Sequence, residues 1–219
     1  MKIFRSFILA LSFLISSVSY AQETSKAATK MNKEVKEIIS LGKDAIIVLA
    51  LNLIDEEVNA KDFRQTKIMT NGKEIYVSFI NPIKFLPINS NFYFDVGVNI
   101  SSGVIYKNSI TNPPEFSNEK KITFYKETPI IRKHITFVIE SINNIDISNL
   151  NNFEGEMIIR ENKEFYAVNV ISKFQESWYK VKKKSGEKYD ENHAHLEPLP
   201  FEIEEKPKFR EINFTKNKK

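Results

Sequence analysis

The chain has 219 residues, a formal net charge of +4 and no cysteine, and 42% of its residues are hydrophobic. This hydrophobic content suffices for a packed core, and the lack of cysteine excludes cysteine proteases, thiol oxidoreductases and cysteine-ligated zinc sites. Two of the 32 basic residues, Lys2 and Arg5, lie at the N-terminus, so 30 basic residues face 28 acidic ones in the remainder. Such a balance gives no concentrated basic face for nucleic acid.

Residues 1–21 have the pattern of a secretory signal peptide. Lys2 and Arg5 precede the apolar run Phe7–Ile15, and Ser19-Tyr20-Ala21 offers a small-x-small cleavage site. The apolar run is shorter than the ~20 residues that a membrane-spanning helix needs. We therefore predict cleavage after Ala21, no transmembrane span in the mature chain, and a periplasmic or secreted location. No cysteine follows the cleavage site, so we do not predict a lipoprotein.

Two helices are predicted at the start of the mature chain. Glu23–Leu41 carries apolar residues at a period near 3.6, and Gly42 is a natural stop. Asp44 is then able to cap a second helix that runs to Val58. Because Ala45–Leu51 is apolar without a break, this second helix is predicted to be buried all round, with a sheet packed against it.

From Asp62 the hydrophobic period changes to two, which predicts strands. Asn71-Gly72 predicts a hairpin with a type I′ turn, in which both residues have positive φ. Pro82 and Pro87 lie in a connection, 81–91, that is predicted to be irregular or an edge. The strands of this unit are predicted at 62–70, 73–80, 92–100 and 104–110, and the unit ends before residue 121.

A second unit of the same kind is predicted over residues 121–200. Residues 122–125 form a bridging strand, and Thr128-Pro129 begins a helix to Asn143, because threonine caps and proline suits the first helical position. Strands are predicted at 153–160, 163–173, 176–183 and 187–196. The charged tail, 201–219, is predicted to be loosely ordered, with Phe209, Ile212 and Phe214 available for docking.

The predicted fold class is thus α+β, with two helix-plus-antiparallel-meander units, 22–120 and 121–200. Asn71–Tyr76 echoes Glu161–Tyr166 at an offset of 90, and Ser102-Gly103 echoes Ser185-Gly186. Internal duplication explains these matches, and chance similarity between amphipathic strands is the alternative.

A helix followed by an antiparallel meander resembles the cystatin-like and nuclear-transport-factor-2-like folds. Trp178-Tyr179-Lys180-Val181 followed by Ser185-Gly186-Glu187-Lys188 is similar to the strand-turn-strand of bacterial PepSY modules. The resemblance covers two segments of about seventy residues each and includes no invariant motif. It implies exported binding, inhibitory or immunity-type modules rather than enzymes, although fold alone does not fix function.

Two candidate sites lie in the second unit. His193 and His195, two residues apart on a predicted strand, share a face and form a candidate metal site with Glu197. The alternative is a solvent-facing polar strand end. No other cofactor is predicted.

Trp178, Tyr179, Lys180 and Lys182 form a candidate partner-binding strand, because aromatic and basic residues are common at interfaces. The alternative is an edge strand that uses lysine to resist edge-to-edge pairing.

The sequence predicts an exported, non-catalytic protein that binds a protein or small ligand in the cell envelope, with inhibitor or immunity factor as examples of such a role. Catalytic patterns such as G-x-S-x-G and H-E-x-x-H do not occur. Two alternatives remain: a metal-dependent hydrolase that uses His193 and His195, and a structural component of an envelope complex.

Overall fold

The computed structural model describes residues 31–54, 58–113, 121–142, 153–172, 174–196 and 208–214. These ranges contain α-helices and two β-sheets, which confirms a mixed α+β fold. None of their helices has the length and apolar character needed to cross a lipid bilayer. The predicted signal peptide, 1–21, lies outside the described residues.

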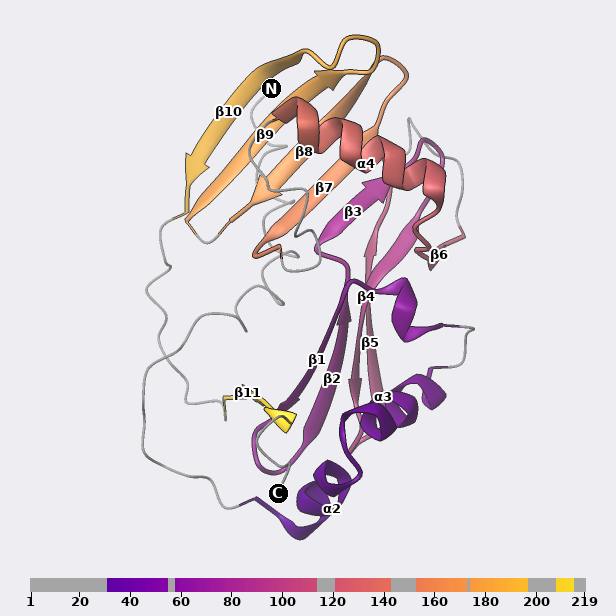
Figure 1. Cartoon of the computed structure of the whole chain (residues 1–219), viewed down its shortest axis with the longest axis vertical. Helices are drawn as coiled ribbons and strands as arrows, with labels where there is room; N and C mark the ends of the chain where they lie inside the picture. The colour runs from indigo at the N-terminus through magenta and orange to yellow at the C-terminus, as the bar shows by residue number, and fades with distance from the viewer. Residues whose placement is uncertain are drawn as a thin grey trace.

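The two sheets lie at opposite ends of the molecule (Figure 1). The first sheet contains β1 (Gln65–Thr70), β2 (Ile75–Ile80), β4 (Phe92–Asn99), β5 (Val104–Ile110), β6 (Thr123–Phe124) and β11 (Arg210–Glu211), in the order β11-β1-β2-β4-β5, with β6 beside β4. The second sheet contains β3 (Ile83–Leu86), β7 (Glu156–Glu161), β8 (Phe165–Ile171), β9 (Gln175–Lys182) and β10 (Lys188–His195), in the order β10-β9-β8-β7-β3. The helices are α2 (Lys33–Ser40), α3 (Lys43–Asn52), α4 (Pro129–Ile142) and the short 3-10 helix η1 (Ala60–Asp62).

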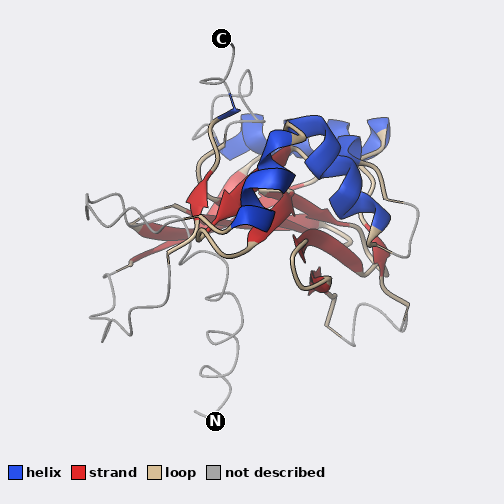
Figure 2. Cartoon of the chain, turned by 90° about the horizontal axis from the view of Figure 1, so that it is seen from below, coloured by secondary structure: helices blue, strands red, loops and turns tan. Residues whose placement is uncertain are grey.

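The helices lie together on one side of the strands (Figure 2). Helices α2 and α3 contribute Val35, Ile46 and Ala50 to a core formed with the first sheet. Helix α4 buries Ile135, Val138, Ile139 and Ile142 against the second sheet, at the spacing of one helical face. Each sheet therefore has an inner face, which the helices cover, and an outer face on the opposite side.

The start of α4 is as predicted from its capping residues. Pro129 is the first helical residue, and the Thr128 hydroxyl accepts a hydrogen bond from the Ile131 amide at 3.2 Å. The proline lacks the amide hydrogen that would be unpaired in this position, so both residues favour a helix that begins here.

The prediction that the second helix is buried all round is wrong. Ile46 and Ala50 are buried, but Val48, Leu49 and Leu53 are exposed. The helix lies on the surface of the first sheet with α2 as its neighbour, so the face that points away from the sheet has no described element over it.

The hairpin predicted at Asn71-Gly72 exists, but its turn differs from the prediction. Thr70 pairs directly with Ile75, so the loop has four residues rather than two. Gly72 has φ +86°, whereas Asn71 does not have positive φ. The Asn71 side chain instead accepts hydrogen bonds from the amides of Lys73 and Glu74, both at 2.9 Å. This asparagine closes the turn with its side chain and not with its backbone.

One segment passes from the first sheet to the second. Strand β2 leaves β4 after Ile80, and the chain continues through Asn81-Pro82 into β3, which pairs in parallel with β7. The Asn81 amide donates to Asp95 Oδ1 at 2.8 Å, and the Pro82 carbonyl accepts from the Met157 amide at 2.7 Å. The predicted connection at 81–91 is therefore partly an edge strand, and this strand is fully buried.

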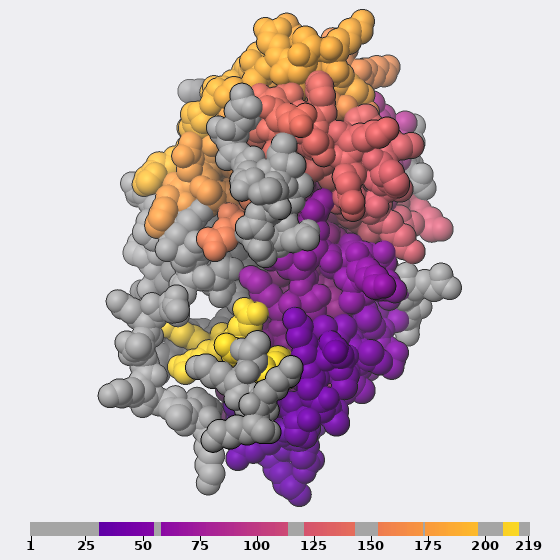
Figure 3. Space-filling model, in the orientation of Figure 1, coloured from indigo at the N-terminus to yellow at the C-terminus, as the bar shows by residue number. Residues whose placement is uncertain are grey.

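Three strands cross the borders of the predicted units. Strand β3 belongs to the first unit by sequence but to the second sheet in space, while β6 does the reverse. Strand β11, from the tail, pairs with β1, and Ile212 and Phe214 pack against the first core. Figure 3 shows these C-terminal residues against the first half of the chain.

Helices α2 and α3 precede the antiparallel strands β1, β2, β4 and β5, and helix α4 precedes the antiparallel strands β7, β8, β9 and β10. The two halves nevertheless do not match at the predicted offset. Ile75 points into the first core, whereas Phe165, its predicted equivalent, is absent from the second core, where its neighbour Tyr166 is buried. The equivalent pairs are Thr70–Ile75 and Glu161–Tyr166, an offset of 91 between Ile75 and Tyr166. A shift of one residue moves a side chain to the other face of a strand, so this echo does not align equivalent positions.

Candidate functional site

The outer face of the second sheet carries a group of aromatic and basic side chains. Strand alternation places Trp178, Lys180 and Lys182 on this face, because Tyr179 and Val181 between them point into the core. The registers add Phe165 from β8, Tyr189 from β10 and Arg160 from β7. We call these six residues the aromatic-basic face.

Cations and rings interleave on this face. Lys180 Nζ lies 5.5 Å from the centroid of the Phe165 ring, and Lys182 Nζ lies 5.5 Å from that of Tyr189. The Phe165 and Tyr189 rings meet edge to face, with centroids 6.5 Å apart. These contacts hold long side chains in defined positions, which reduces the entropy that a partner must remove on binding.

The two lysines also form ion pairs with carboxylates at the margin of the sheet. Lys180 Nζ lies 2.5 Å from Asp190 Oδ2, and Lys182 Nζ lies 2.6 Å from Glu187 Oε2. In both cases the hydrogen bond to the carboxylate raises the pKa of the lysine, so the amines stay charged. Much of the positive charge of these two residues is thus already compensated.

Arg160 is different, because within the described ranges no carboxylate forms an ion pair with it. The register places it in one row with Ala167, Lys180 and Tyr189 across the sheet. Burial lowers the pKa of the guanidinium, and the charge of Glu156 offsets part of this effect. A partly buried guanidinium without a carboxylate is poorly solvated, and an incoming anion would stabilise it.

The structure separates the four residues of the predicted partner-binding strand. Trp178 is 37% exposed on the outer face with Lys180 and Lys182, whereas Tyr179 is 4% exposed and belongs to the inner core. Strand β9 lies between β8 and β10, so the alternative that the lysines guard an edge strand is wrong. The edge strand beside β9 is β10, where an irregular register and Asp190, with φ +53°, interrupt the pairing.

Sequence reasoning missed Arg160, Phe165 and Tyr189. These residues lie on three strands, and only the pairing register brings them beside Trp178. The alternation of Phe165 with Tyr166 was visible in the sequence, but it does not reveal which of the two residues faces the core.

His193 and His195 occupy alternate positions on β10, opposite Ser177 and Gln175. Both ring nitrogens of His193 are engaged: Nδ1 lies 2.9 Å from Ser177 Oγ and 2.9 Å from Gln175 Nε2, and Nε2 lies 2.9 Å from Glu191 Oε1. Glu197 lies outside the described residues. Among the residues that the structure does describe, no three histidines and carboxylates are grouped so that they could hold a metal ion.

Ser177, His193 and Glu191 are hydrogen-bonded in that order, and these residue types are used in nucleophilic catalysis. Here, however, Ser177 is 6% exposed and lies within a strand that is paired on both sides. Because β9 pairs with β8 and β10, its backbone groups beside Ser177 belong to the ladders of the sheet. The hydrogen bond between Ser177 on β9 and His193 on β10 instead links the side chains of these two neighbouring strands.

His134, the remaining histidine, is half-buried beside the core of the second sheet. Its Nδ1 lies 2.6 Å from Tyr166 Oη, and its ring stacks on Phe85 with centroids 5.3 Å apart. Burial, followed by the charge of Glu161, raises the pKa of Tyr166 to about 12. The neutral hydroxyl is therefore stable here as a hydrogen-bond partner for the imidazole.

Comparisons of this chain with protein-family models, curated proteins and solved structures found no match.

Proposed function

We propose that the protein is an exported, non-catalytic binding protein, and that the aromatic-basic face contacts a partner protein in the cell envelope. The observation that carries the proposal is that Trp178, Phe165 and Tyr189 share a sheet face opposite the helices, together with three cations. Tryptophan, tyrosine and arginine are the residues most enriched among those that dominate binding energy.

Arg160 suggests the chemistry of the partner. Its guanidinium is partly desolvated, and in the described ranges no carboxylate forms an ion pair with it. A carboxylate of the bound protein would form an ion pair with this guanidinium through up to two parallel hydrogen bonds. Trp178 would then bury its remaining exposed surface against the same partner. Inhibitors and immunity factors are roles of this kind, and export follows from the predicted signal peptide at residues 1–21.

Affinity capture from the native envelope tests the proposal, with the mature chain as bait and bound proteins identified by mass spectrometry. The triple variant Trp178→Ala, Lys180→Ala, Lys182→Ala and the single variant Arg160→Gln are expected to lose the partner and keep their circular dichroism spectrum. Tyr106→Ala is the matched control, because Tyr106 is an exposed aromatic residue on the other sheet. Equal capture by the triple variant and the wild type would refute this assignment of the face.

A further inference from the structure

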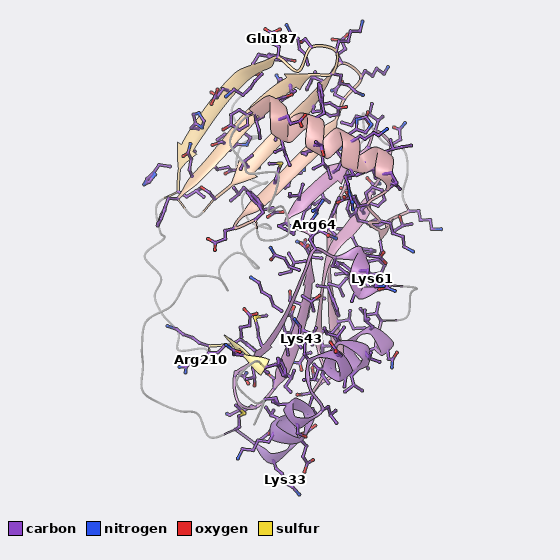
Figure 4. The ribbon with its side chains drawn as sticks, in the orientation of Figure 1. Lys33, Lys43, Lys61, Arg64, Glu187 and Arg210 are labelled. Carbon is purple, nitrogen blue, oxygen red and sulfur yellow. The ribbon has the colours of Figure 1, made fainter. Side chains whose placement is uncertain are left out.

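A pocket of about 320 Å³ lies at one end of the second sheet, between the β7–β8 turn and the β9–β10 turn. Its lining includes four lysines, Lys163, Lys182, Lys183 and Lys184. It also includes two residues that carry hydroxyl groups, Ser185 and Tyr189. The turns are distant in sequence, and the sheet brings them together. Glu187, labelled in Figure 4, marks this end of the molecule.

The two turns are fixed to each other through Lys183. Its amide donates to the Glu164 carbonyl at 3.1 Å, and its Nζ donates to the Asn162 carbonyl at 3.3 Å. Lys183 Nζ also lies 2.5 Å from Glu161 Oε1. Gly186, with φ +70°, ends the second turn in a conformation that other residues rarely adopt. The shape of the pocket is therefore fixed by backbone hydrogen bonds and by the half-buried ion pair between Lys183 and Glu161.

The charge of the pocket is only partly compensated. Lys182 and Lys183 pair with Glu187 and Glu161, but within the described ranges Lys163 and Lys184 have no carboxylate at ion-pair distance. Glu164 is the single acidic residue in the pocket lining. Lysines collected on two turns repel one another, and an anion between them would remove this repulsion.

We infer that this pocket binds a phosphate-rich anion, one with two or more linked phosphate groups. Lysine binds phosphate as a mobile point charge, and the two hydroxyl groups add hydrogen bonds. The cations come from two separate turns around a pocket wider than one phosphate, so a chain of phosphates or a cluster of headgroups contacts more of them than a single ion does. The pocket shares Lys182 and Tyr189 with the aromatic-basic face. Lys163 and Lys184 lie outside that face, so variants of these two lysines test the inference separately from the proposed partner.

Titration calorimetry of the whole mature chain with tripolyphosphate at low salt tests the inference. We expect saturable binding that falls steeply with added salt, and a loss of about tenfold or more in affinity for the double variant Lys163→Ala, Lys184→Ala. The matched control is Lys43→Ala, Lys61→Ala, which removes the same charge near the first sheet, where both lysines are exposed (Figure 4). The control is expected to bind like the wild type.

A second arm separates the two sources of such a ligand. Co-sedimentation with phosphatidylglycerol vesicles, compared with phosphatidylcholine vesicles, reports on lipid headgroups, and tripolyphosphate reports on free phosphate chains. Dependence on Lys163 and Lys184 in either arm supports the site and identifies its source. The inference is overturned if neither ligand binds, or if the control variant loses as much affinity as the pocket variant, since binding then follows net charge alone.

Discussion

Lys84 and Asp95 join the two sheets through a buried ion pair. Lys84 Nζ, on β3 of the second sheet, lies 2.6 Å from Asp95 Oδ2, on β4 of the first, and the two side chains are 4% and 7% exposed. Glu156 on β7 completes the group, with its Oε1 at 2.7 Å from the same amine. Strand β3, the first strand after the chain passes from one sheet to the other, thus carries a charge that pairs with a carboxylate from each sheet.

Replacing Lys84 with methionine should destabilise the protein strongly. The change leaves the buried Asp95 and the half-buried Glu156 without their cation, and breaking a buried pair in this way costs about 3–5 kcal/mol. Urea denaturation measures the loss. Lys180→Met, which breaks an ion pair exposed to solvent, is the control and should leave the midpoint nearly unchanged. Adding Asp95→Asn to Lys84→Met should restore part of the loss; no recovery would mean that the lysine stem, not its charge, is what matters.

The protein should become less stable above about pH 10. Burial lowers the pKa of Lys84, but Asp95 and Glu156 outweigh burial and raise it above its ordinary value of 10.5. The pKa of Tyr166 is raised from 10.0 to about 12. Above the ordinary pKa values of 10.5 and 10.0, unfolded chains lose these two protons while folded chains still keep them. The stability gained from the two raised pKa values is therefore complete below the ordinary values and falls as the pH rises through the folded-state values. Melting temperatures from about pH 8 to about pH 12 test the expectation, and Tyr166→Phe should make the decline shallower. A constant melting temperature across this range would contradict it.

Gly97 leaves space for Tyr76 on the outer face of the first sheet. A Cβ at this position would lie 1.6 Å from Tyr76 Oη, so Gly97→Ala must displace the tyrosine ring from its place near Tyr106 and Phe209. We expect a loss of about 1–3 kcal/mol in the free energy of unfolding. In a Tyr76→Leu background, which removes the obstructing hydroxyl, the same change should be close to neutral. Equal losses in both backgrounds would show that the tyrosine is not the cause.

Ending the chain at residue 207 should weaken the first half. Strand β11 pairs with β1, the Ile212 amide donates to the Ile68 carbonyl at 2.8 Å, and Ile212 and Phe214 pack on the first core. Their removal should cost about 2 kcal/mol in unfolding free energy and reduce hydrogen-exchange protection in β1. Ile212→Ala with Phe214→Ala should reproduce most of the effect. Arg210→Ala, which alters an exposed side chain, should not (Figure 4).

Zinc should not stabilise the protein through His193. Both ring nitrogens already face partners on β9 and β10, so a metal ion would have to displace Ser177, Gln175 or Glu191. His193→Phe is expected to reduce hydrogen-exchange protection along β10, with no difference from wild type in its response to added zinc. A zinc-dependent rise in melting temperature that this variant abolishes would restore the metal-site hypothesis.

Local sequence signals predicted the elements well. Thr128-Pro129 marks the start of α4, and the alternating run from residue 92 to residue 100 marks β4, because caps and period-two patterns are recorded in neighbouring residues. Where a side chain and its neighbour are both large, as in Phe165-Tyr166, the pattern does not show which one is buried. The face that β8 presents, and with it the place of Phe165 in the aromatic-basic face, depends on pairing with other strands.

Long-range partners could not be predicted in this way. The pairing of β3 with β7 and of β11 with β1 joins segments far apart in the chain, and both strands are too short to have a strong pattern of their own. Lys84 lies in the connection 81–91, for which the sequence predicted only an irregular segment or an edge. Its burial depends on carboxylates from two other strands, which no local window contains.

The passage of the chain from β2 in the first sheet to β3 in the second also constrains the order in which the fold can form. During synthesis β2 emerges early and finds β1 and β4 within its own neighbourhood, but β3 has to wait for β7. In that interval the half-made chain presents Ile83 and Phe85 without their core, and Lys84 without Glu156. The junction between the two sheets therefore forms only after β7 is available.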